Sequence, residues 1–385
     1  MIPRHQPAYT WRQWQIALAD RRPLPILEAE LEARICQRLG RKHAIFYHRG
    51  RDAFFAWFST IAPRRPAIVP AFTCCVVPEA IRNAGNPLTY ADIDKATLNM
   101  EVDNLMSAPM IRNSVVVMTH QFGLPCRADE IMQYAHDHNA AVFEDCAGAL
   151  GASYAGRPCG SFGDVAVVSF ENTKLLGSGS LGVLLTNEDD VAARLREEQQ
   201  RMRISHISVS RETAFLKVIN SNALYRPIFK IWSWQKGDYF GDHGVQQQFR
   251  HAHYQRCPDP FAIALALAQW SDIDRRIAHR RELMSIYREH LGEEITCTIN
   301  GDAIESPIRQ PVRTSNKRAL FEALFNRGID LGWSFGYTTT PDDRARDFPN
   351  ASSLAMQILN LPIHEGVTRK DARRISALAA KSLGR

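Results

Sequence analysis

Short apolar segments recur along the first half of the chain and alternate with segments of helical pattern. The apolar segments centre near residues 45, 68, 88, 116, 142, 166 and 183. Two of them, residues 115–118 and 165–168, show no polar–apolar alternation, which is typical of strands buried on both faces of a parallel sheet. The alternation of such strands with helical segments predicts an α/β fold with a mostly parallel, seven-stranded sheet covered by helices.

Helical periodicity also predicts how the chain divides into parts. Leu27, Leu31, Ile35 and Leu39 recur every four residues and predict an amphipathic helix near the N-terminus. A longer apolar pattern over residues 261–291 predicts one long helix that two domains share. We expect an N-terminal arm over residues 1–30, a large domain over 31–274 and a small α/β domain over 275–385.

Length and composition are those of an ordinary globular enzyme. With 385 residues, 45% hydrophobic and 23% charged, the chain is long enough to bury a large core. The net charge of +6 is modest for this length, and no zinc-finger spacing or other nucleic-acid signature is present. We therefore expect no nucleic-acid partner.

The cysteine pattern and the apolar run lengths bear on the compartment. Eight cysteines are scattered along the chain without a Cys-x-x-Cys pair, which favours a reduced, cytoplasmic protein over a disulfide framework. The first residues lack the apolar core of a signal peptide, and no run of about 18 apolar residues predicts a spanning helix. His251 and His253 are too isolated to predict a metal site, so no metal is expected.

The candidate chemistry lies between residues 142 and 182. Asp145 ends one predicted strand, and Lys174 follows the end of another, so both can face one pocket at the same edge of the sheet. An aldehyde cofactor such as pyridoxal phosphate needs this pair, with the lysine amine forming a Schiff base and the carboxylate keeping the pyridine nitrogen protonated. Ser169 can offer a hydroxyl to the cofactor phosphate. On these residues alone, an ordinary strand end and a surface lysine remain an equal alternative.

Four ordered motifs in this stretch resemble the DegT/StrS-type aminotransferases, which are fold-type-I pyridoxal-phosphate enzymes. The motifs are Glu144-Asp145, then Gly151-Ala152-Ser153-Tyr154-Ala155-Gly156, then Gly163-Asp164, and then Ser169-Phe170-Glu171-Asn172-Thr173-Lys174. The resemblance extends over residues 28–200 and 258–385 and weakens between 203 and 257. It implies the fold-type-I architecture, a homodimer with active sites at its interface, and transamination in which Lys174 carries the cofactor and moves protons.

The resemblance also assigns cofactor-binding positions, several of which depart from the family pattern. Gly50 and Arg51 occupy the phosphate loop, where the family has threonine in place of Arg51, and the guanidinium there can still bind phosphate. Cys74 stands where the family has an aromatic residue that stacks on the cofactor, a task that Phe72 could take over. Gly148 stands where the family has glutamine, and His120 belongs to a His-x-x-Gly turn on the pocket side.

These features predict a pyridoxal-phosphate-dependent aminotransferase that acts on an amino-acid donor and a keto or aldehyde acceptor. The Gly-x-Asn-x-Arg motif of the family is missing from residues 254–260, so the acceptor is either a keto-sugar or another natural-product intermediate. A different pyridoxal-phosphate reaction, such as decarboxylation, elimination or carbon–carbon bond formation, is the first alternative. A catalytically idle regulatory member of the family is the second. Basic and aromatic residues between 203 and 257 are expected to pack on the domain or on a partner subunit, or else to meet an apolar substrate or a membrane surface.

Overall fold

The computed structural model describes residues 1–61, 64–109, 112–202, 208–221, 224–225, 227–228, 254, 257–333, 338–340 and 342–385. The divergent segment 203–257 lies largely outside this description, and so do His251 and His253. Only helix α8 (Val209–Ile219) represents that segment as a defined element here.

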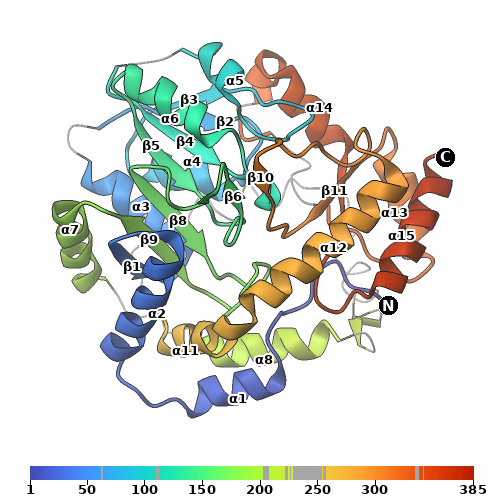
Figure 1. Ribbon diagram of the computed structural model, residues 1–385, viewed down its shortest axis with the longest axis horizontal. Helices are drawn as coiled ribbons and strands as arrows, with labels where there is room; N and C mark the ends of the chain where they lie inside the picture. The colour runs from blue at the N-terminus through green and yellow to red at the C-terminus, as the bar shows by residue number, and fades with distance from the viewer. Residues whose placement is uncertain are drawn as a thin grey trace.

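A seven-stranded sheet forms the centre of the molecule (Figure 1). Its order is β1-β9-β8-β5-β4-β2-β3, and β9 alone runs antiparallel to its neighbours β1 and β8. The strands are β1 (His43–Tyr47), β2 (Ala67–Pro70), β3 (Leu88–Ala91), β4 (Val115–Thr119), β5 (Ala141–Asp145), β8 (Val165–Ser169) and β9 (Gly182–Thr186). The seven strands that the sequence predicts, and their mostly parallel arrangement, are confirmed.

The sheet is buried on both faces because two hydrophobic clusters lie on opposite sides of it. In β1, Ile45 belongs to one cluster and Phe46 to the other, and in β8, Val165 and Ala166 divide in the same way. Successive strand residues point to opposite faces, so both sets must be apolar. This explains the absence of polar–apolar alternation in the sequence.

Most helices from the first part of the chain pack on the sheet, whereas the first of them packs against the later helix α11 (Pro260–Gln269). They are α1 (Trp11–Ala19), α2 (Leu24–Leu39), α3 (Gly50–Thr60), α4 (Val76–Asn83), α5 (Val102–Met106), α6 (Ala128–Asp137) and α7 (Asp189–Gln200), with the short 3-10 helix η1 (Gln121–Gly123). The predicted helix around Leu27–Leu39 is α2, whose four apolar positions are all buried. Two short strands, β6 (Ser153–Tyr154) and β7 (Arg157–Pro158), form a hairpin beside the sheet.

The C-terminal part packs beside the large sheet and begins after a break in the predicted long helix. The pattern over 261–291 is divided into α11 (Pro260–Gln269), a 3-10 turn η2 (Trp270–Asp272) and α12 (Ile273–Leu291), so the prediction of one continuous helix is wrong. The remaining elements are β10 (Ala303–Ile304), β11 (Gln310–Arg313), α13 (Lys317–Phe325), η3 (Asp342–Asp347), α14 (Pro349–Gln357), β12 (Ile358–Leu361) and α15 (Arg369–Ser382). Strands β11 and β12 pair antiparallel, and β10 joins the hairpin of β6 and β7.

The N-terminal segment reaches the C-terminal part rather than extending away from the molecule. The amide of Ile2 donates to the carbonyl of Gly328 at 2.8 Å, and the guanidinium of Arg4 pairs with Asp330 at 2.7 Å. Both chain ends accordingly lie on the same side of the molecule, next to α15 (Figure 1). This contact brings residues 4–6 close to the region between the two parts of the chain.

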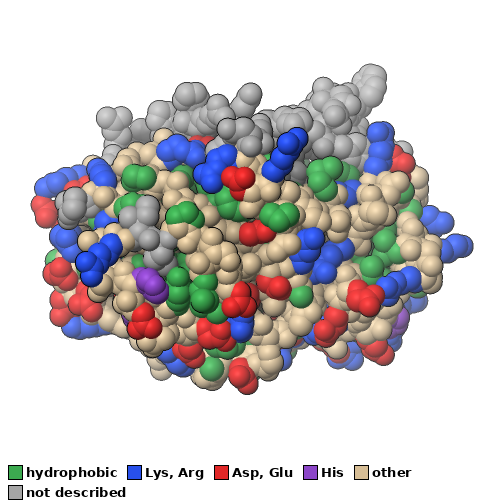
Figure 2. Space-filling model, turned by 90° about the horizontal axis from the view of Figure 1, so that it is seen from above, with side chains coloured by type: hydrophobic (Ala, Val, Ile, Leu, Met, Phe, Trp, Pro, Cys, Tyr) green, Lys and Arg blue, Asp and Glu red, His purple; other side chains and the backbone are tan. Residues whose placement is uncertain are grey.

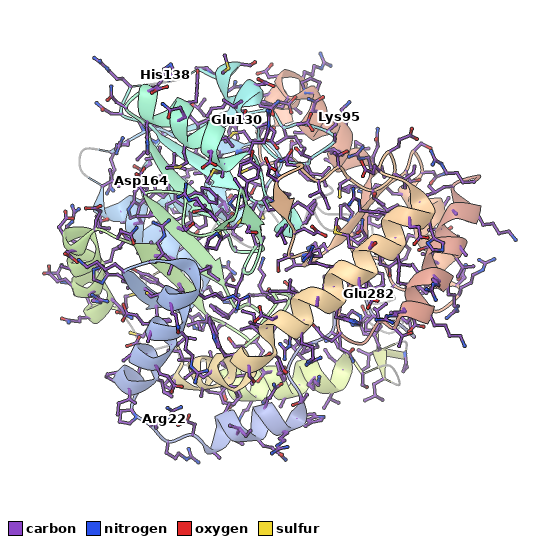
Figure 3. All side chains as sticks on the ribbon, in the orientation of Figure 1. Arg22, Lys95, Glu130, His138, Asp164 and Glu282 are labelled. Carbon is purple, nitrogen blue, oxygen red and sulfur yellow. The ribbon has the colours of Figure 1, made fainter. Side chains whose placement is uncertain are left out.

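Charged side chains of both signs are spread over the surface. On the face seen in Figure 2, acidic and basic side chains are interspersed, and Arg22 and His138 lie at the margin of the molecule in Figure 3. Within the described residues, no helix combines the length and the apolar character needed to cross a membrane.

Candidate active site

A cavity of about 520 Å³ opens at the carboxyl ends of the parallel strands. The eight residues singled out from the sequence all line it: Gly50, Arg51, Cys74, His120, Asp145, Gly148, Ser169 and Lys174. Asp145 and Ser169 are the last residues of β5 and β8, and the other six lie in the segments that follow β1, β2, β4, β5 and β8, whose ends meet at one edge of the sheet. The structure therefore brings together residues that are up to 124 positions apart, as Gly50 and Lys174 are.

Asp145 and Lys174 provide an acid and an amine at the floor of this cavity. Asp145 is the last residue of β5, and its carboxylate accepts the amide of Ala147 at 3.0 Å. Burial raises the pKa of Asp145, although the amide of Ala147 and the charge of Lys174 oppose this effect. Lys174 is half-buried, and the described residues give its amine no hydrogen-bond acceptor. The amine is thus available for a ligand.

One end of the cavity suits an anion. Helix α3 begins at Gly50. The amides of Asp52 and Ala53 donate to the carbonyl of Arg49, so the amides of Gly50 and Arg51 lie at the N-terminus of the helix, before its regular series of hydrogen bonds begins. Burial and the neighbouring Arg49 both lower the pKa of Arg51, because each disfavours its charge. A bound phosphate would stabilise the charged guanidinium of Arg51 and so oppose both effects. The partial positive charge of the helix N-terminus also favours an anion at this position.

A glycine keeps this anion-binding end in shape. A Cβ atom added to Gly182, the first residue of β9, would lie 2.3 Å from the carbonyl carbon of Arg49 and 2.4 Å from the amide nitrogen of Gly50. Only glycine permits the loop before α3 to lie so close to the sheet. Ser169 is also close to this loop, because its Cβ atom lies 3.5 Å from the position of a Cβ atom added to Gly50.

Cys74 has an acidic thiol for a cysteine. A hydrogen bond with Cys75 lowers the pKa of Cys74 to about 7 against the effect of burial, and the amide of Val76 and the charge of Lys174 act in the same direction. Phe72, the alternative platform considered from the sequence, is not among the residues that line the cavity and instead packs edge-on against Phe122. The proposal that Phe72 replaces the missing aromatic ring is therefore not supported.

His120 is held by a buried carboxylate on the far side of the cavity wall. The amide of Cys126 donates to Nδ1 at 3.2 Å, so His120 donates through Nε2 to Glu144 at 3.0 Å. Both ring nitrogens are engaged, and only the ring carbons remain to contact a ligand in the cavity.

Glu144 organises this side of the site. Its oxygens also accept the amides of Gly160, Phe162 and Gly163 at 2.6 to 2.9 Å. Although burial raises the pKa of Glu144, the bonds from His120 and from these amides lower it to about 2. The thiol of Cys146 also donates to Oε1 of Glu144, at 3.2 Å, so hydrogen bonds account for the close approach of His120, Glu144 and Cys146, whose ligand atoms lie within 4.8 Å of one another.

Gly148 makes room for a residue from the C-terminal part. A Cβ atom added to Gly148 would lie 2.9 Å from Cδ1 of Ile308, which also lines the cavity. The volume that a glutamine would occupy is thus partly filled by Ile308. The amide of Ile308 donates to the carbonyl of Phe122 at 3.0 Å and holds this segment in place.

The cavity contains two buried threonine hydroxyls for which the described residues provide no hydrogen-bond partner. The hydroxyls of Thr73 and Thr119 are buried, line the cavity and have no hydrogen-bond partner in the described part of the chain. Buried polar groups are nearly always paired, so these hydroxyls point to a polar ligand. Together with an amine, a carboxylate and a cationic helix N-terminus, they fit pyridoxal phosphate.

Sequence reasoning missed several residues of the cavity. Thr119 is the last residue of β4 and precedes His120, and the only local signal for it is that it is the first polar residue after four apolar ones. Arg49 directly precedes Gly50 and Arg51, the two residues that the sequence assigns to the phosphate loop. Ile308 and Arg309 come from a segment without a local motif, and only the tertiary structure shows that they face the cavity.

Comparisons with known proteins agree with the fold. The model of the DegT/DnrJ/EryC1/StrS aminotransferase family matches residues 27–379. The GDP-perosamine synthase of Caulobacter vibrioides is 33% identical over 169 residues, which cover 43% of this chain and 46% of that protein. A UDP-N-acetyl-3-dehydro-alpha-D-glucosamine 3-aminotransferase of Acidithiobacillus ferrooxidans is 32% identical over the same length, with 43% and 46% covered. These matches thus span a little under half of each relative.

The structural similarity extends over the whole chain. The sugar aminotransferase CalS13 from Micromonospora echinospora superposes with a TM-score of 0.76, covers 99% of this chain and 100% of its own, and is 20% identical. This neighbour shares the fold-type-I architecture, which confirms the fold expected from the sequence.

Proposed function

The chain belongs to the DegT/DnrJ/EryC1/StrS aminotransferase family, and we propose that it is a pyridoxal-phosphate-dependent aminotransferase. It moves an amino group from an amino-acid donor to a keto or aldehyde acceptor, either a keto-sugar or a related natural-product intermediate. The observation that carries this proposal is the meeting of Lys174, Asp145 and the N-terminus of α3 in one cavity. The names of the relatives, which describe sugar-aminating enzymes, support the choice of acceptor class.

Different residues of the cavity would bind different parts of the cofactor. Lys174 would attach it through its amine, and Asp145 would face the pyridine nitrogen. The amides of Gly50 and Arg51, the guanidinium of Arg51 and the hydroxyl of Ser169 would bind the phosphate. Cys74, His120 and Gly148 would line the ring. When bound, pyridoxal phosphate supplies an electron sink that makes a proton on the donor carbon acidic.

Asp145 and Lys174 then have separate tasks. Buried Asp145 keeps a positive charge on the group it faces, because a carboxylate in a site of low polarity interacts strongly with a nearby cation. Once displaced, the amine of Lys174 takes a proton from the donor carbon and returns it at the neighbouring position. The thiol of Cys74 narrows the cavity beside this amine.

We also propose a homodimer in the cytoplasm, with the domain boundaries expected above. The eight cysteines are all unpaired, which supports a reducing compartment. The family resemblance is the support for the dimer.

The test is the visible spectrum of the purified protein before and after addition of glutamate and other amino donors. We expect an absorbance band at about 410–430 nm that Lys174→Ala abolishes, and that amino donors remove from the wild-type spectrum as the amine form of the cofactor appears. Lys42→Ala, which alters an exposed lysine paired with Asp189, should leave the band intact. A spectral change without the amine form would favour another pyridoxal-phosphate reaction, and a protein that takes up no cofactor would leave the idle regulatory alternative.

A further inference from the structure

One wall of the candidate active-site cavity carries two adjacent cysteines. Cys74 and Cys75 lie between β2 and α4, and Cys75 is the residue before α4 begins. Cys74 lines the cavity together with Thr73, Val76 and Val77, whereas Cys75 is 5% exposed and does not line it. The two thiols form a hydrogen bond with each other. One sulfur atom thus lies at the cavity, and a second lies within hydrogen-bond distance of it.

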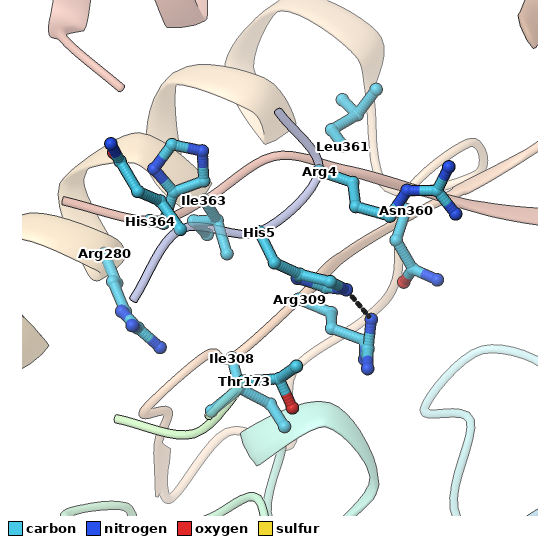
Figure 4. A pocket seen from close by; sticks show the side chains of 11 residues that line it. Arg4, His5, Thr173, Arg280, Ile308, Arg309, Asn360, Leu361, Ile363 and His364 are labelled. Carbon is cyan, nitrogen blue, oxygen red and sulfur yellow. Dashed lines mark hydrogen bonds between the residues drawn. The ribbon is translucent and has the colours of Figure 1, made fainter. Parts of the chain in front are cut away.

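Cys74 is the residue of this cavity that an oxidant attacks most readily. Among the described residues that line the cavity, it alone contains sulfur. The C-terminal part contributes Ile308 and Arg309 to the wall. Figure 4 shows the small adjoining cavity of about 10 Å³, which Asn360 lines and where Arg309 donates to Nε2 of His5 at 2.9 Å. The described residues on that side carry no sulfur either, so a peroxide that enters meets a single thiol.

The surroundings of Cys74 favour the nucleophilic thiolate. The hydrogen bond from Cys75 has the largest effect on the pKa of Cys74 and lowers it to about 7. The amide of Val76 and the charge of Lys174 act in the same direction, whereas burial and the charge of Asp145 raise this pKa. Burial raises the pKa of the six cysteines elsewhere in the chain, which are Cys36, Cys126, Cys146, Cys159, Cys257 and Cys297. Cys74 therefore reacts before those six with a peroxide at neutral pH.

We propose that Cys74 and Cys75 form a reversible disulfide when a hydroperoxide enters the cavity, and that this modification weakens cofactor binding. With hydrogen peroxide, the thiolate of Cys74 attacks one oxygen, the O–O bond breaks, and a sulfenic acid forms on Cys74. The hydroxide that leaves takes up a proton from solvent, which balances the proton lost when the thiolate formed. The sulfur of Cys75 then attacks that of Cys74, the S–S bond forms, and the proton of Cys75 leaves with the hydroxyl group as water. Two thiols are thus oxidised to one disulfide, and one peroxide is reduced to two water molecules.

The adjacent positions of the two cysteines make this disulfide easy to reduce again. Consecutive Cα atoms are about 3.8 Å apart, which is less than the roughly 4.4–6.8 Å that most disulfides span. A disulfide between neighbours is therefore strained, and strained disulfides are the labile ones. A small thiol returns the pair to its reduced form, in which all eight cysteines are unpaired.

Closure of the disulfide moves one wall of the cavity. The segment before Cys74 is fixed, because Ala71 donates to the carbonyl of Ala91 at 2.8 Å and accepts the amide of Thr339 at 3.0 Å. The change therefore falls on the peptide between the two cysteines and on the start of α4, where the amide of Val77 donates to the carbonyl of Cys74 at 3.0 Å. Val77 lines the cavity, so cofactor binding weakens. This effect on the cofactor rests on the proposed function, whereas the disulfide itself does not.

Peptide mass spectrometry after peroxide treatment tests the disulfide. The reduced protein is treated with hydrogen peroxide near neutral pH, unfolded, blocked with N-ethylmaleimide and digested with trypsin without reductant. The tryptic peptide that ends at Arg82 contains Cys74, Cys75 and no other cysteine. We expect this peptide to be unlabelled and lighter by two hydrogen atoms, and to carry two labels when dithiothreitol precedes the blocking step. A peptide that keeps both labels, is joined to another cysteine, or carries only sulfinic or sulfonic acid would overturn the proposal.

The matched variant is Cys75→Ser, which keeps a hydrogen-bond donor beside Cys74 but removes the second sulfur. Without that sulfur, the sulfenic acid on Cys74 has no neighbouring thiol to react with, so we expect the higher oxides that dithiothreitol does not reverse. Cys36 is the internal control, because it is also half-buried and should keep its label in both proteins. If Cys74 resists peroxide as Cys36 does, Cys74 is not the residue that reacts and the proposal is wrong.

Titration with pyridoxal phosphate, followed by absorbance, tests the effect on the cofactor. The reduced protein, the peroxide-treated protein and the treated protein after dithiothreitol are compared. We expect cofactor affinity to fall at least about tenfold on oxidation and to return on reduction. Equal affinity of the oxidised and reduced proteins would overturn the proposed effect on the cofactor site. If even the reduced protein takes up no pyridoxal phosphate, the proposed function fails, whereas the peptide measurement still decides whether the disulfide forms.

Discussion

Glu144 illustrates how a single buried charge supports the site without contacting it. Its carboxylate joins the histidine of the cavity wall to three backbone amides of the loop 160–163. Removing the charge leaves these donors with a weaker acceptor in a dry environment. The contribution of Glu144 is therefore to stability and to the orientation of His120.

This arrangement predicts a specific acid sensitivity. The pKa of Glu144 is about 2 in the folded protein against an ordinary value of 4.5. A depressed pKa gives stability that is fully present above pH 4.5 and is lost as the pH falls toward 2, which here amounts to about 3 kcal/mol. Urea unfolding across this pH range should show the loss in the native protein.

The matched variants are Glu144→Gln and Glu282→Gln. Glu144→Gln should lower the free energy of unfolding at neutral pH by about 3–5 kcal/mol and flatten the acid-dependent part. Glu282 pairs with Arg369 at the surface, so Glu282→Gln should change little. An unchanged acid-dependent part in Glu144→Gln would contradict the assignment.

Cys74 predicts a second pH dependence, in the opposite direction. Its pKa of about 7, against an ordinary 9.0, means that the nucleophilic thiolate forms as the pH rises through 7. Alkylation of Cys74 by iodoacetamide, followed by peptide mass spectrometry, should reach half of its maximal rate near that pH. Added pyridoxal phosphate should protect Cys74.

Cys36 is the internal control for this experiment. It is also half-buried, but burial raises its pKa to about 11, so it should react only at higher pH and without protection by the cofactor. Identical pH profiles for the two cysteines would show that Cys75 and Lys174 do not acidify Cys74.

At the scale of residues, the sequence could identify those that follow strand ends. Asp145, His120 and Ser169 end or follow apolar strands, and parallel strands deliver such residues to one edge. Arg309 and Asn360 lie in a loop and a short strand whose pairing is set by tertiary contacts, so no local pattern could place them. The unpartnered hydroxyls of Thr73 and Thr119 are likewise visible only when their surroundings are known.

At the scale of elements, periodicity predicts that a helix exists more reliably than where it ends. Apolar positions continue through residues 261–291, so the pattern could not reveal the 3-10 turn at Trp270–Asp272. No proline or glycine marks that turn. Its surroundings are tertiary: Gln269 donates to the carbonyl of Gly177 at 3.1 Å and accepts from Arg276 at 2.7 Å.

The close contact between β9 and the start of α3 can be tested by a substitution at Gly182. Gly182→Ala should displace the loop before α3, because the new Cβ would meet the backbone of Arg49 at 2.3 Å. We expect cofactor affinity to fall at least about tenfold, because the amides at the helix N-terminus move, and stability to fall by about 1–3 kcal/mol. Titration with pyridoxal phosphate, followed by absorbance, measures the first effect.

The control for this substitution is Gly301→Ala. Gly301 is exposed, and a Cβ atom there would meet nothing within 4 Å. If Gly182→Ala binds the cofactor as tightly as Gly301→Ala, the loop before α3 is not part of the phosphate site.

At the scale of the whole molecule, the cavity is closed by a seam between the large sheet and the C-terminal part. The amide of Ser306 donates to the carbonyl of Gly123 at 3.0 Å, and a Cβ atom on Gly123 would lie 2.1 Å from the oxygen of Ser306. The backbones thus approach as closely as glycine allows. Changes on one side of the seam must therefore be matched on the other.

Gly148 and Ile308 test this coupling across the seam. Gly148→Gln alone should destabilise the protein by about 1–3 kcal/mol, because the side chain overlaps with Ile308. Ile308→Ala alone should cost about 2–5 kcal/mol, because it leaves a void. The double variant should be more stable than the sum of the two effects by about 1 kcal/mol or more, since the glutamine fills that void.

Urea unfolding of the two single variants and the double variant gives this coupling energy directly. Gly148→Gln combined with Ile304→Ala is the matched control, because Ile304 is 46% exposed and pairs with Ser153 away from Gly148. Strictly additive effects in the Gly148–Ile308 pair would mean that the loop after β5 and the segment before β11 pack independently. In that case, the contact with the side chain of Ile308 would not explain why position 148 is a glycine.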